Sequence, residues 1–190
     1  LLGGHDAADM NVEAWLWALL EKDWGAATAR RIVEAHLNQP PHDLTLKTGA
    51  DGPAFAAETG AEILPTGSLR LPGRPQITTL PGYEQGAWWV QDAAAALPVQ
   101  LLGDVAGKRV LDLCAAPGGK TLQLAAGGAA VTALDLSENR MARLRQNLDR
   151  TGLTAETVVA DALLWKPEAA FDAIIVDAPC SATGTVRRHP

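Results

Sequence analysis

The spacing of hydrophobic residues predicts helices in the first forty residues. Residues 11–25, "NVEAWLWALLEKDWG", repeat apolar side chains at the three- and four-residue intervals of an amphipathic helix: Val12, Trp15, Leu16, Leu19 and Leu20. Residues 27–37, "ATARRIVEAHL", continue in helical style until Pro40 and Pro41 end the pattern. We interpret residues 1–41 as the end of a helical domain. Because the chain opens at "LLGG" without a methionine, we expect it to begin inside that domain.

The pattern changes at residue 42 to short extended segments separated by Gly, Pro and Thr. Candidate strands lie at 43–47, 61–65, 68–71 and 76–80, which predicts a small strand-containing α+β segment over residues 42–86. Residues 86–102, "GAWWVQDAAAALPVQLL", then read as a helix that carries Trp88 and Trp89. Large aromatic side chains usually bury their area, so we expect these two to pack in a core, with base stacking as the open alternative.

From residue 87 onward, strands and helices alternate. Extended apolar runs lie at 108–116, 129–137, 155–161 and 171–180, and amphipathic helices at 120–126 and 138–152 lie between the first three. Strands that alternate with helices form a parallel sheet buried on both faces. Residues 87–190 are therefore predicted to be a Rossmann-like, doubly wound α/β domain whose parallel sheet is incomplete.

Composition fits a soluble, cytoplasmic globular protein. The chain is 47% hydrophobic, its mean hydropathy is +0.01, and it has neither an apolar run long enough to span a membrane nor a signal-peptide pattern. Its two cysteines, Cys114 and Cys180, match no recurring metal-ligand spacing, so we expect no metal site.

Charge is distributed unevenly along the chain. Residues 1–95 hold 6 Lys and Arg against 12 Asp and Glu, whereas residues 96–190 hold 10 of each. The net charge of -6 argues against a protein that grips nucleic acid by bulk electrostatics, because such affinity comes from cations that neutralise phosphates. Any contact with RNA must be local.

Each of the four predicted strands ends at or near an acidic residue: Asp112, Asp135, Asp161 and Asp177. In doubly wound sheets, ligands bind at the carboxyl ends of the strands, where the strand order reverses. Four carboxylates at that edge suit a ligand rich in hydroxyl and amino groups.

The segment after the first strand, "APGGKT" at 116–121, is a weak match to a phosphate-binding loop because the first glycine of that motif is absent. Asp135 follows Asp112 by 23 residues, where a ribose-binding acid belongs. S-adenosylmethionine offers a ribose, an adenine amine and a cationic amino-acid tail without phosphates, and it fits these acids better than a dinucleotide. Simpler roles remain open: a tight turn at Gly118 and Gly119, capping by Asp112 and Asp161, and a buried Cys114.

The fourth strand ends in "DAPCSATG", in which Cys180 follows Asp177. Carbon 5 of a pyrimidine becomes nucleophilic once a thiolate adds to carbon 6, so a cysteine beside a positioned acid suits methylation at carbon 5. Asp177 could hydrogen-bond either the base edge or the cofactor. A cysteine buried in a loop is the alternative interpretation.

These motifs resemble a known family. "VLDLCAAPGGKT", "ALDLSENR", "VVADA", "FDAIIVDAPCSATGTVRRHP" and "EQGAWWVQDAAAALP" are similar to the rRNA cytosine-5 methyltransferases of the Sun (Fmu, RsmB-type) family, over about residues 42–190. The resemblance implies a helical RNA-binding domain ending near residue 41, a small segment, and a class I methyltransferase core that uses S-adenosylmethionine. It implies a cofactor loop made of Cys114, Ala115, Ala116, Pro117, Gly118, Gly119 and Lys120.

The resemblance also implies roles for the acids and for Cys180. Asp135 would hold the ribose, Asp161 would lie by the adenine, and Asp177 would lie where the methionine and the target base meet. Such RNA enzymes generally take their nucleophile from a Thr-Cys pair after a fifth strand, and the cysteine at Cys180 assists product release. We therefore expect a fragment that does not turn over, cut from a parent that methylates small-subunit rRNA.

Several alternatives stay open. The parent could methylate tRNA at carbon 5 of cytosine, or it could be a non-catalytic RNA-binding or ribosome-assembly protein that keeps the fold. An amino-methyltransferase and a reductase are disfavoured, because the Asn/Asp-Pro-Pro-aromatic motif and the phosphate-binding glycines are missing. Candidate RNA contacts are Arg187, Arg188, His189, Arg70 and Arg74, and the oligomeric state is undetermined by the sequence.

Overall fold

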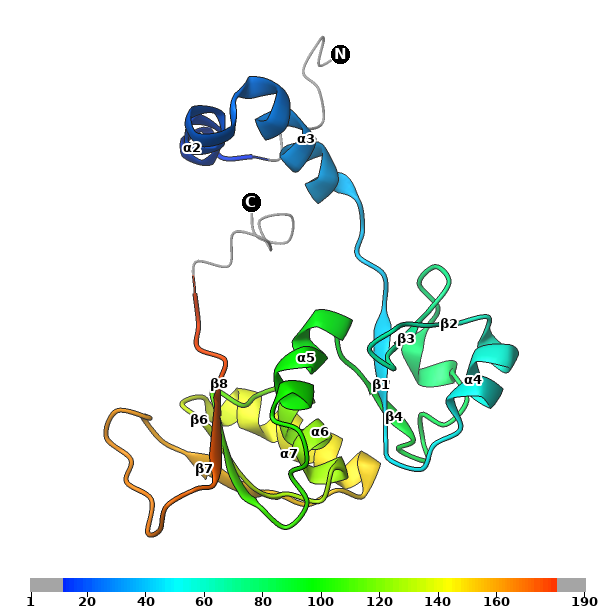
Figure 1. Cartoon of the computed structure of the whole chain (residues 1–190), viewed down its shortest axis with the longest axis vertical. Helices are drawn as coiled ribbons and strands as arrows, with labels where there is room; N and C mark the ends of the chain where they lie inside the picture. Colours follow the sequence, from blue (N-terminus) through cyan, green and yellow to red (C-terminus); the bar gives the residue numbers. More distant parts are fainter. Residues whose placement is uncertain (1–11, 181–190) are drawn as a thin grey trace. The chain divides into compact units, whose positions relative to one another are not determined.

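The structure, a computed structural model, describes residues 12–180 (Figure 1). Residues 41–178 form one compact unit, and residues 12–40 with 179–180 belong to another. None of the helices in residues 12–180 is both long enough and apolar enough to cross a membrane.

The N-terminal unit contains the two helices that the sequence predicted. Helix α2 spans Ala14–Trp24 and helix α3 spans Ala26–Leu37, with Gly25 between them in a positive-φ conformation. Of the predicted apolar stripe, only Leu16 is fully buried, while Trp15 and Leu19 are exposed. Two short helices bury a narrow strip of side chains when they pack against each other, which leaves the rest of the stripe in solvent.

A four-stranded antiparallel sheet forms the first part of the larger unit. Its strands are β1 (Asp43–Leu46), β2 (Glu62–Ile63), β3 (Leu69–Arg70) and β4 (Trp88–Val90), in the order β2-β3-β1-β4. The predictions at 43–47, 61–65 and 68–71 are confirmed. The strand expected at 76–80 is wrong, because Ile77–Thr79 form a 3-10 helix.

Helix α4 (Gly52–Thr59) was not predicted by the hydrophobic pattern, although its ends carry ordinary signals. The Asp51 carboxylate accepts a hydrogen bond from Ala54 N at 2.9 Å, Pro53 occupies the first turn, and Gly60 closes the helix in the left-handed conformation. Its eight residues bury only Gly52 and Phe55, which is too short a run for a periodicity to be visible.

The helix expected over residues 86–102 is wrong in its first half. Trp88–Val90 form strand β4, which pairs with β1, and helix α5 (Ala93–Leu101) begins only after Asp92, whose carboxylate accepts a hydrogen bond from Ala94 N. The prediction that Trp88 and Trp89 pack in the core is confirmed, since they are 0% and 2% exposed. Because successive side chains of a strand point to opposite faces, Trp88 packs in the core of the small sheet and Trp89 packs in the core beside α6 and α7.

The second part of the larger unit is a four-stranded parallel sheet. Strands β5 (Arg109–Leu113), β6 (Ala130–Asp135), β7 (Glu156–Val159) and β8 (Ala173–Val176) lie in the order β7-β6-β5-β8, and helices α6 (Gly119–Ala126) and α7 (Glu138–Thr151) connect the first three. The predicted α/β, Rossmann-like class is confirmed. The strand order reverses between β5 and β8, and this is where a ligand crevice is expected.

Helices α5, α6 and α7 pack on one face of the parallel sheet (Figure 1). The buried side chains of that face are Val110, Val131, Ala133 and Ile175, which meet Val99, Leu122, Leu124, Met141, Leu144 and Leu148 of the helices. Because residues alternate along a strand, Ile174 and Val176 point to the opposite face, and both are exposed.

The C-terminal end of α7 joins the small sheet to the parallel sheet. Arg150 donates hydrogen bonds to the carbonyl oxygens of Tyr83 and Trp88, and Lys47 Nζ donates to Thr151 O at 2.6 Å. Gly86, with φ +64°, lies so close that an added Cβ would be 2.2 Å from Arg150 O. The small sheet and the parallel-sheet part are therefore in close contact at the C-terminal end of α7.

We expect Gly86→Ala to destabilise the protein more than the same change at Gly73. Both glycines have positive φ, so an alanine at either site costs about 1 kcal/mol in backbone strain. At Gly86 the methyl group would also overlap backbone of α7, whereas nothing lies within 4 Å at Gly73. Urea unfolding should show a loss of about 3 kcal/mol for Gly86→Ala and about 1 kcal/mol for Gly73→Ala. Equal losses of unfolding free energy would show that the backbone around Gly86 and the end of α7 can shift to accommodate the methyl group at little cost.

Candidate functional site

A cavity of about 330 Å³ lies where the order of the parallel strands reverses. One side is formed by the parallel-sheet part: Asp112, Cys114, Ala115, Ala116, Pro117, Gly119, Lys120, Arg140 and Asp177. The other side is formed by four residues from the end of β4 and the start of α5: Val90, Gln91, Asp92 and Ala95. The structure thus brings most of the predicted cofactor loop and two of the four predicted acids to one cavity.

The loop between β5 and α6 depends on an unusual backbone. Cys114 has φ +60°, the one positive-φ residue other than glycine among those that the structure describes. Gly118 has φ +110°, and a Cβ there would lie 2.9 Å from Leu144 Cγ. A non-glycine residue in this conformation is held there by its surroundings and is frequent at functional sites. The turn brings the loop back over α7 and starts α6 at Gly119.

Asp112 is the most deeply buried acid of the cavity, with 1% of its surface exposed. Its Oδ2 accepts a hydrogen bond from Thr121 Oγ1 at 2.6 Å, while Oδ1 has no hydrogen-bond partner among the described residues. Burial raises the pKa of Asp112 to about 6, although the Thr121 hydrogen bond and the Lys120 charge oppose the rise. An unpartnered buried carboxylate oxygen beside a cavity is suited to a cationic or hydrogen-bond-donating ligand.

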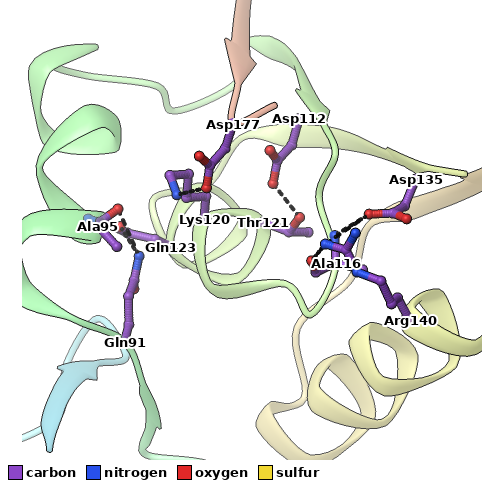
Figure 2. A network of polar contacts seen from close by, with 10 residues as sticks. All are labelled: Gln91, Ala95, Asp112, Ala116, Lys120, Thr121, Gln123, Asp135, Arg140 and Asp177. Atoms are coloured by element: carbon purple, nitrogen blue, oxygen red, sulfur yellow. Dashed lines mark hydrogen bonds and ion pairs between the residues drawn. The ribbon is translucent and has the colours of Figure 1, made fainter. Parts of the chain in front are cut away.

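Lys120 and Asp177 form an ion pair at the mouth of the cavity. Lys120 Nζ lies 2.6 Å from Asp177 Oδ2, and the pair joins the first turn of α6 to the residue directly after β8 (Figure 2). The Asp177 side chain is 62% exposed, so its second oxygen is accessible to a ligand. Asp177 is therefore the accessible acid of the site and Asp112 the buried one.

Asp135 holds the loop between β5 and α6 in place. Its Oδ2 accepts a hydrogen bond from Ala116 N at 3.1 Å, and its Oδ1 accepts one from Ser137 N at 3.0 Å. Arg140 Nη2 lies 3.5 Å from Asp135 Oδ2 and also donates to Ala116 O (Figure 2). Asp135 is 2% exposed and does not line the cavity, whereas Arg140 does.

Asp161 stands apart from the cavity lining. Its carboxylate accepts a hydrogen bond from Leu163 N at 2.9 Å, and its carbonyl accepts bonds from Leu164 N and Trp165 N. These bonds close a turn over residues 162–164 that does not continue into a helix, so the helix-capping role that the sequence left open for Asp161 is wrong. A contact between Asp161 and an adenine stays a prediction.

The remaining predicted residues are Cys180, Arg187, Arg188, His189, Arg70 and Arg74, and of these Arg74 hydrogen-bonds His42 Nε2. Cys180 is exposed and belongs to a different unit from the cavity, so its catalytic role stays a prediction. Arg187, Arg188 and His189 lie outside the described residues. Arg70 donates two hydrogen bonds to the buried Asp43 carboxylate, at 2.8 and 2.9 Å, and this pairing lowers the pKa of Asp43. Arg70 thus has a structural role that its sequence context did not reveal.

Four side chains that shape the cavity were not predicted from the sequence: Arg140, Gln91 and Asp92 line it, and Thr121 hydrogen-bonds Asp112. Thr121 and Arg140 occur at ordinary positions of helical segments, where their residue types carry no signal. Gln91 and Asp92 were hidden by the incorrect helix over residues 86–102.

Comparison with known proteins gives a consistent result. Residues 99–190 match the family model described as 16S rRNA methyltransferase RsmB/F. The ribosomal RNA small subunit methyltransferase B of Vibrio cholerae is 38% identical, in an alignment that covers 98% of this chain and 46% of that protein. The protein of the same name from Cronobacter sakazakii is 46% identical over 65% of this chain and 30% of its own length.

A solved structure supports the fold over nearly the whole chain. The methyltransferase homolog protein from Pyrococcus horikoshii is 27% identical and superposes with a TM-score of 0.74, covering 93% of this chain and 67% of that one. The chain spans about half the length of the curated relative from Vibrio cholerae.

We expect Asp112→Asn to stabilise the protein at high pH and not at low pH. The folded-state pKa of Asp112, about 6, is above its ordinary value of 3.8, so the folded state binds the proton more tightly than the unfolded state. Stability is therefore lost as the pH rises from about 4 to about 6, and the loss amounts to about 3 kcal/mol at pH 8. The asparagine side chain of the variant cannot ionise, so the variant does not lose this stability at high pH.

Urea unfolding at pH 4 and pH 8 measures this difference. The free energy of unfolding of Asp112→Asn relative to the wild type should rise by about 3 kcal/mol between the two pH values. The exposed Asp104 provides the matched control, and Asp104→Asn should show no comparable change. A pH-independent difference for Asp112→Asn would mean that the buried carboxyl does not change its ionisation in this range.

Proposed function

Since this chain belongs to the RsmB/F methyltransferase family, we propose that its protein transfers a methyl group from S-adenosylmethionine to small-subunit rRNA. The names of the relatives support the substrate class. The chain spans 46% of the Vibrio cholerae relative, so the proposal concerns the activity of the whole protein. In that activity, these residues would form the cavity that binds the cofactor.

The observation that carries the proposal is the unpartnered Asp112 Oδ1 beside a cavity at the switch point of the parallel sheet. A buried carboxylate oxygen is a costly feature unless a ligand supplies its missing partner. S-adenosylmethionine carries a protonated amine and no phosphate. The cavity lining includes Asp112, Asp177 and Gly119, and the sequence of its loop lacks the first glycine of a phosphate-binding motif, so the residues present fit this cofactor.

Asp112 would receive the cationic amine, and residues 114–120 would form the wall against which the cofactor lies. Asp135 would face the ribose and Asp161 the adenine, as the family resemblance implies. In the structure the Asp135 carboxylate is covered by Ala116 N and Arg140. Arg140 has a half-exposed side chain, so we infer that its guanidinium moves aside when a ribose hydroxyl bonds to Asp135.

We propose carbon 5 of a cytosine as the methylated atom. When bound, the cofactor would supply a methyl group on a positively charged sulfur: carbon 5 would bond to the methyl carbon, the sulfur would leave with the electrons of the broken C–S bond, and carbon 5 would afterwards lose its proton. Asp177, exposed beside Lys120, would hydrogen-bond the edge of the base and hold it at the mouth of the cavity. Cys180 follows three residues later, and we propose that its thiol assists product release while a cysteine elsewhere in the whole protein attacks carbon 6.

Two alternatives make different predictions for the substrate. A tRNA cytosine-5 methyltransferase would use the same cavity and would methylate tRNA in place of rRNA. A ribosome-assembly protein that keeps the fold would bind RNA without transferring a methyl group. The buried, unpartnered Asp112 favours an active enzyme over a scaffold, because a scaffold has no use for a destabilising buried acid.

We expect S-adenosylmethionine to bind this chain and to bind more tightly as the pH rises through 6. The amine of the cofactor attracts ionised Asp112, which is about one-tenth populated at pH 5 if its pKa is about 6. Isothermal titration should therefore give an affinity about tenfold lower at pH 5 than at pH 8. Asp112→Asn should bind weakly at both pH values, and Asp135→Ala should lose binding because the cofactor loop is released.

Asp104→Asn, outside the cavity, is the control and should bind like the wild type. Circular dichroism of each variant separates loss of binding from loss of folding. A folded wild-type chain that does not bind S-adenosylmethionine at either pH would contradict the cofactor assignment for these residues.

We expect deletion of the gene for the whole protein to remove a methyl group from carbon 5 of a small-subunit rRNA cytosine. Bisulfite sequencing of rRNA and tRNA measures the loss, and a plasmid with the wild-type gene should restore it. An Asp177→Asn gene should not restore it, because the acid that would hold the base is lost. A loss confined to tRNA would support the tRNA alternative, and no loss would support the assembly protein.

The role of Cys180 is tested in the same strain. A Cys180→Ser protein that cannot release its product should accumulate as a covalent adduct with RNA, visible as a slower band on a denaturing gel. A Cys180→Ser protein that neither methylates nor forms an adduct would identify Cys180 as the attacking group instead.

A further inference from the structure

A chain of side-chain amides connects the small antiparallel sheet to the helix that begins at the cofactor loop. Gln91, which directly follows β4, is 6% exposed and lines the cavity. Its Oε1 accepts a hydrogen bond from Trp89 Nε1 at 2.8 Å, and its Nε2 donates to Gln123 Oε1 at 3.1 Å and approaches Ala95 O at 3.4 Å. Gln123 Nε2 in turn donates to Ala96 O at 3.0 Å.

Trp89 fixes the direction of the hydrogen bonds in this series of amides. An indole N–H can only donate, so the oxygen of the Gln91 amide must face Trp89. The Gln91 amino group must then face Gln123, which turns the oxygen of Gln123 toward it and the Gln123 amino group toward α5. Only one orientation of both amides satisfies every partner, and it contains no ionisable group.

The amide chain lies against the part of α6 that carries the polar contacts of the cavity. The Gln91 side chain packs over Gly119, where a Cβ would lie 3.4 Å from Gln91 Cδ. Gln123 follows Gly119 by one helical turn and faces α5, so Lys120 and Thr121 turn toward Asp177 and Asp112 (Figure 2). A rotation of α6 about its axis would break the amide chain and displace both contacts together.

We propose that Gln91 is a positioning residue for the cofactor site, acting through Gln123 to fix the first turn of α6. The proposal rests on the proposed function and extends it to the small sheet, which lies outside the parallel-sheet core. The cofactor cavity thus depends on the small sheet for the orientation of Lys120 and Thr121 as well as for one of its walls.

The test replaces an amide by a carboxyl group that can donate only when protonated. In Gln91→Glu, one oxygen still accepts from Trp89, but the other faces the oxygens of Gln123 and Ala95. A protonated glutamic acid can donate to Gln123 Oε1, whereas an ionised one repels it, so the pKa of the new side chain is raised. Gln123→Glu, which does not line the cavity, creates the same conflict with Ala96 O.

The dissociation constant of S-adenosylmethionine should respond to pH in both variants relative to the wild type. At pH 5 the dissociation constant of each variant should be close to that of the wild type. At pH 8 it should be about ten times higher, because the ionised carboxylate then faces another hydrogen-bond acceptor with no proton between them. Gln100→Glu makes the same change on the exposed side of α5 and should give a ratio near one throughout. Dividing the dissociation constant of each variant by that of the wild type at the same pH cancels the pH dependence that comes from the ionisation of Asp112, which both proteins share.

A second readout does not require the cofactor. Hydrogen exchange of the amides of residues 119–126 in the ligand-free chain should become faster than in the wild type at pH 8, and match it at pH 5, in both variants. A wild type that fails to bind S-adenosylmethionine while this exchange pattern appears would overturn the cofactor assignment and leave the positioning role standing.

Three results would overturn the positioning role. The first is a binding ratio that does not change with pH in either variant. The second is a pH-dependent loss in Gln91→Glu that Gln123→Glu does not reproduce, which would identify Gln91 as a direct contact of the cofactor. The third is exchange in residues 119–126 that stays at the wild-type rate at pH 8.

Discussion

The carboxylate of Asp112, buried under the first turn of α6, is the constraint around which the cavity is arranged. A parallel sheet brings the ends of β5 and β8 to one edge, and the helices pack on the face toward which Asp112 points. Its desolvation is opposed only in part by Thr121 and Lys120, so the pKa stays raised and one oxygen stays unpartnered. The protein retains a destabilising group at the position where a cationic ligand would compensate for it.

The loop that follows β5 is kept in shape by contacts from two elements, the end of β6 and helix α7. Asp135 binds its backbone from the end of β6, Arg140 binds it from α7, and Asn147 Nδ2 donates to Pro117 O. Cys114, at the start of this loop, has a backbone conformation that a residue other than glycine rarely adopts. The loop is therefore preorganised by its own domain, and side chains predicted to bind the cofactor also have structural roles.

The small sheet is more than a connector between the helical unit and the parallel sheet. It is fixed to the end of α7 through Arg150 and Gly86, and it reaches the cavity through Gln91. Asp43 strengthens this arrangement, because its buried carboxylate pairs with Arg70 on β3 and accepts a hydrogen bond from Ala93 N at the start of α5. One wall of the cavity thus comes from a segment that the sequence analysis predicted to be a plain helix.

The sequence by itself determined the alternating strands and helices of the parallel sheet, the acids at the strand ends and the family. Apolar periodicity and turn residues are local properties, and each β-α unit of this sheet is long enough to express them. The tertiary structure alone decided that Trp88 and Trp89 lie on a strand, because their partner strand β1 is more than forty residues away in the chain. It also decided which acids reach the cavity: Asp112 and Asp177 line it, while Asp135 and Asp161 bond to nearby backbone. Whether a carboxylate at a strand end faces a ligand or a neighbouring amide depends on side-chain packing and on distant backbone, and neither is encoded in the local pattern.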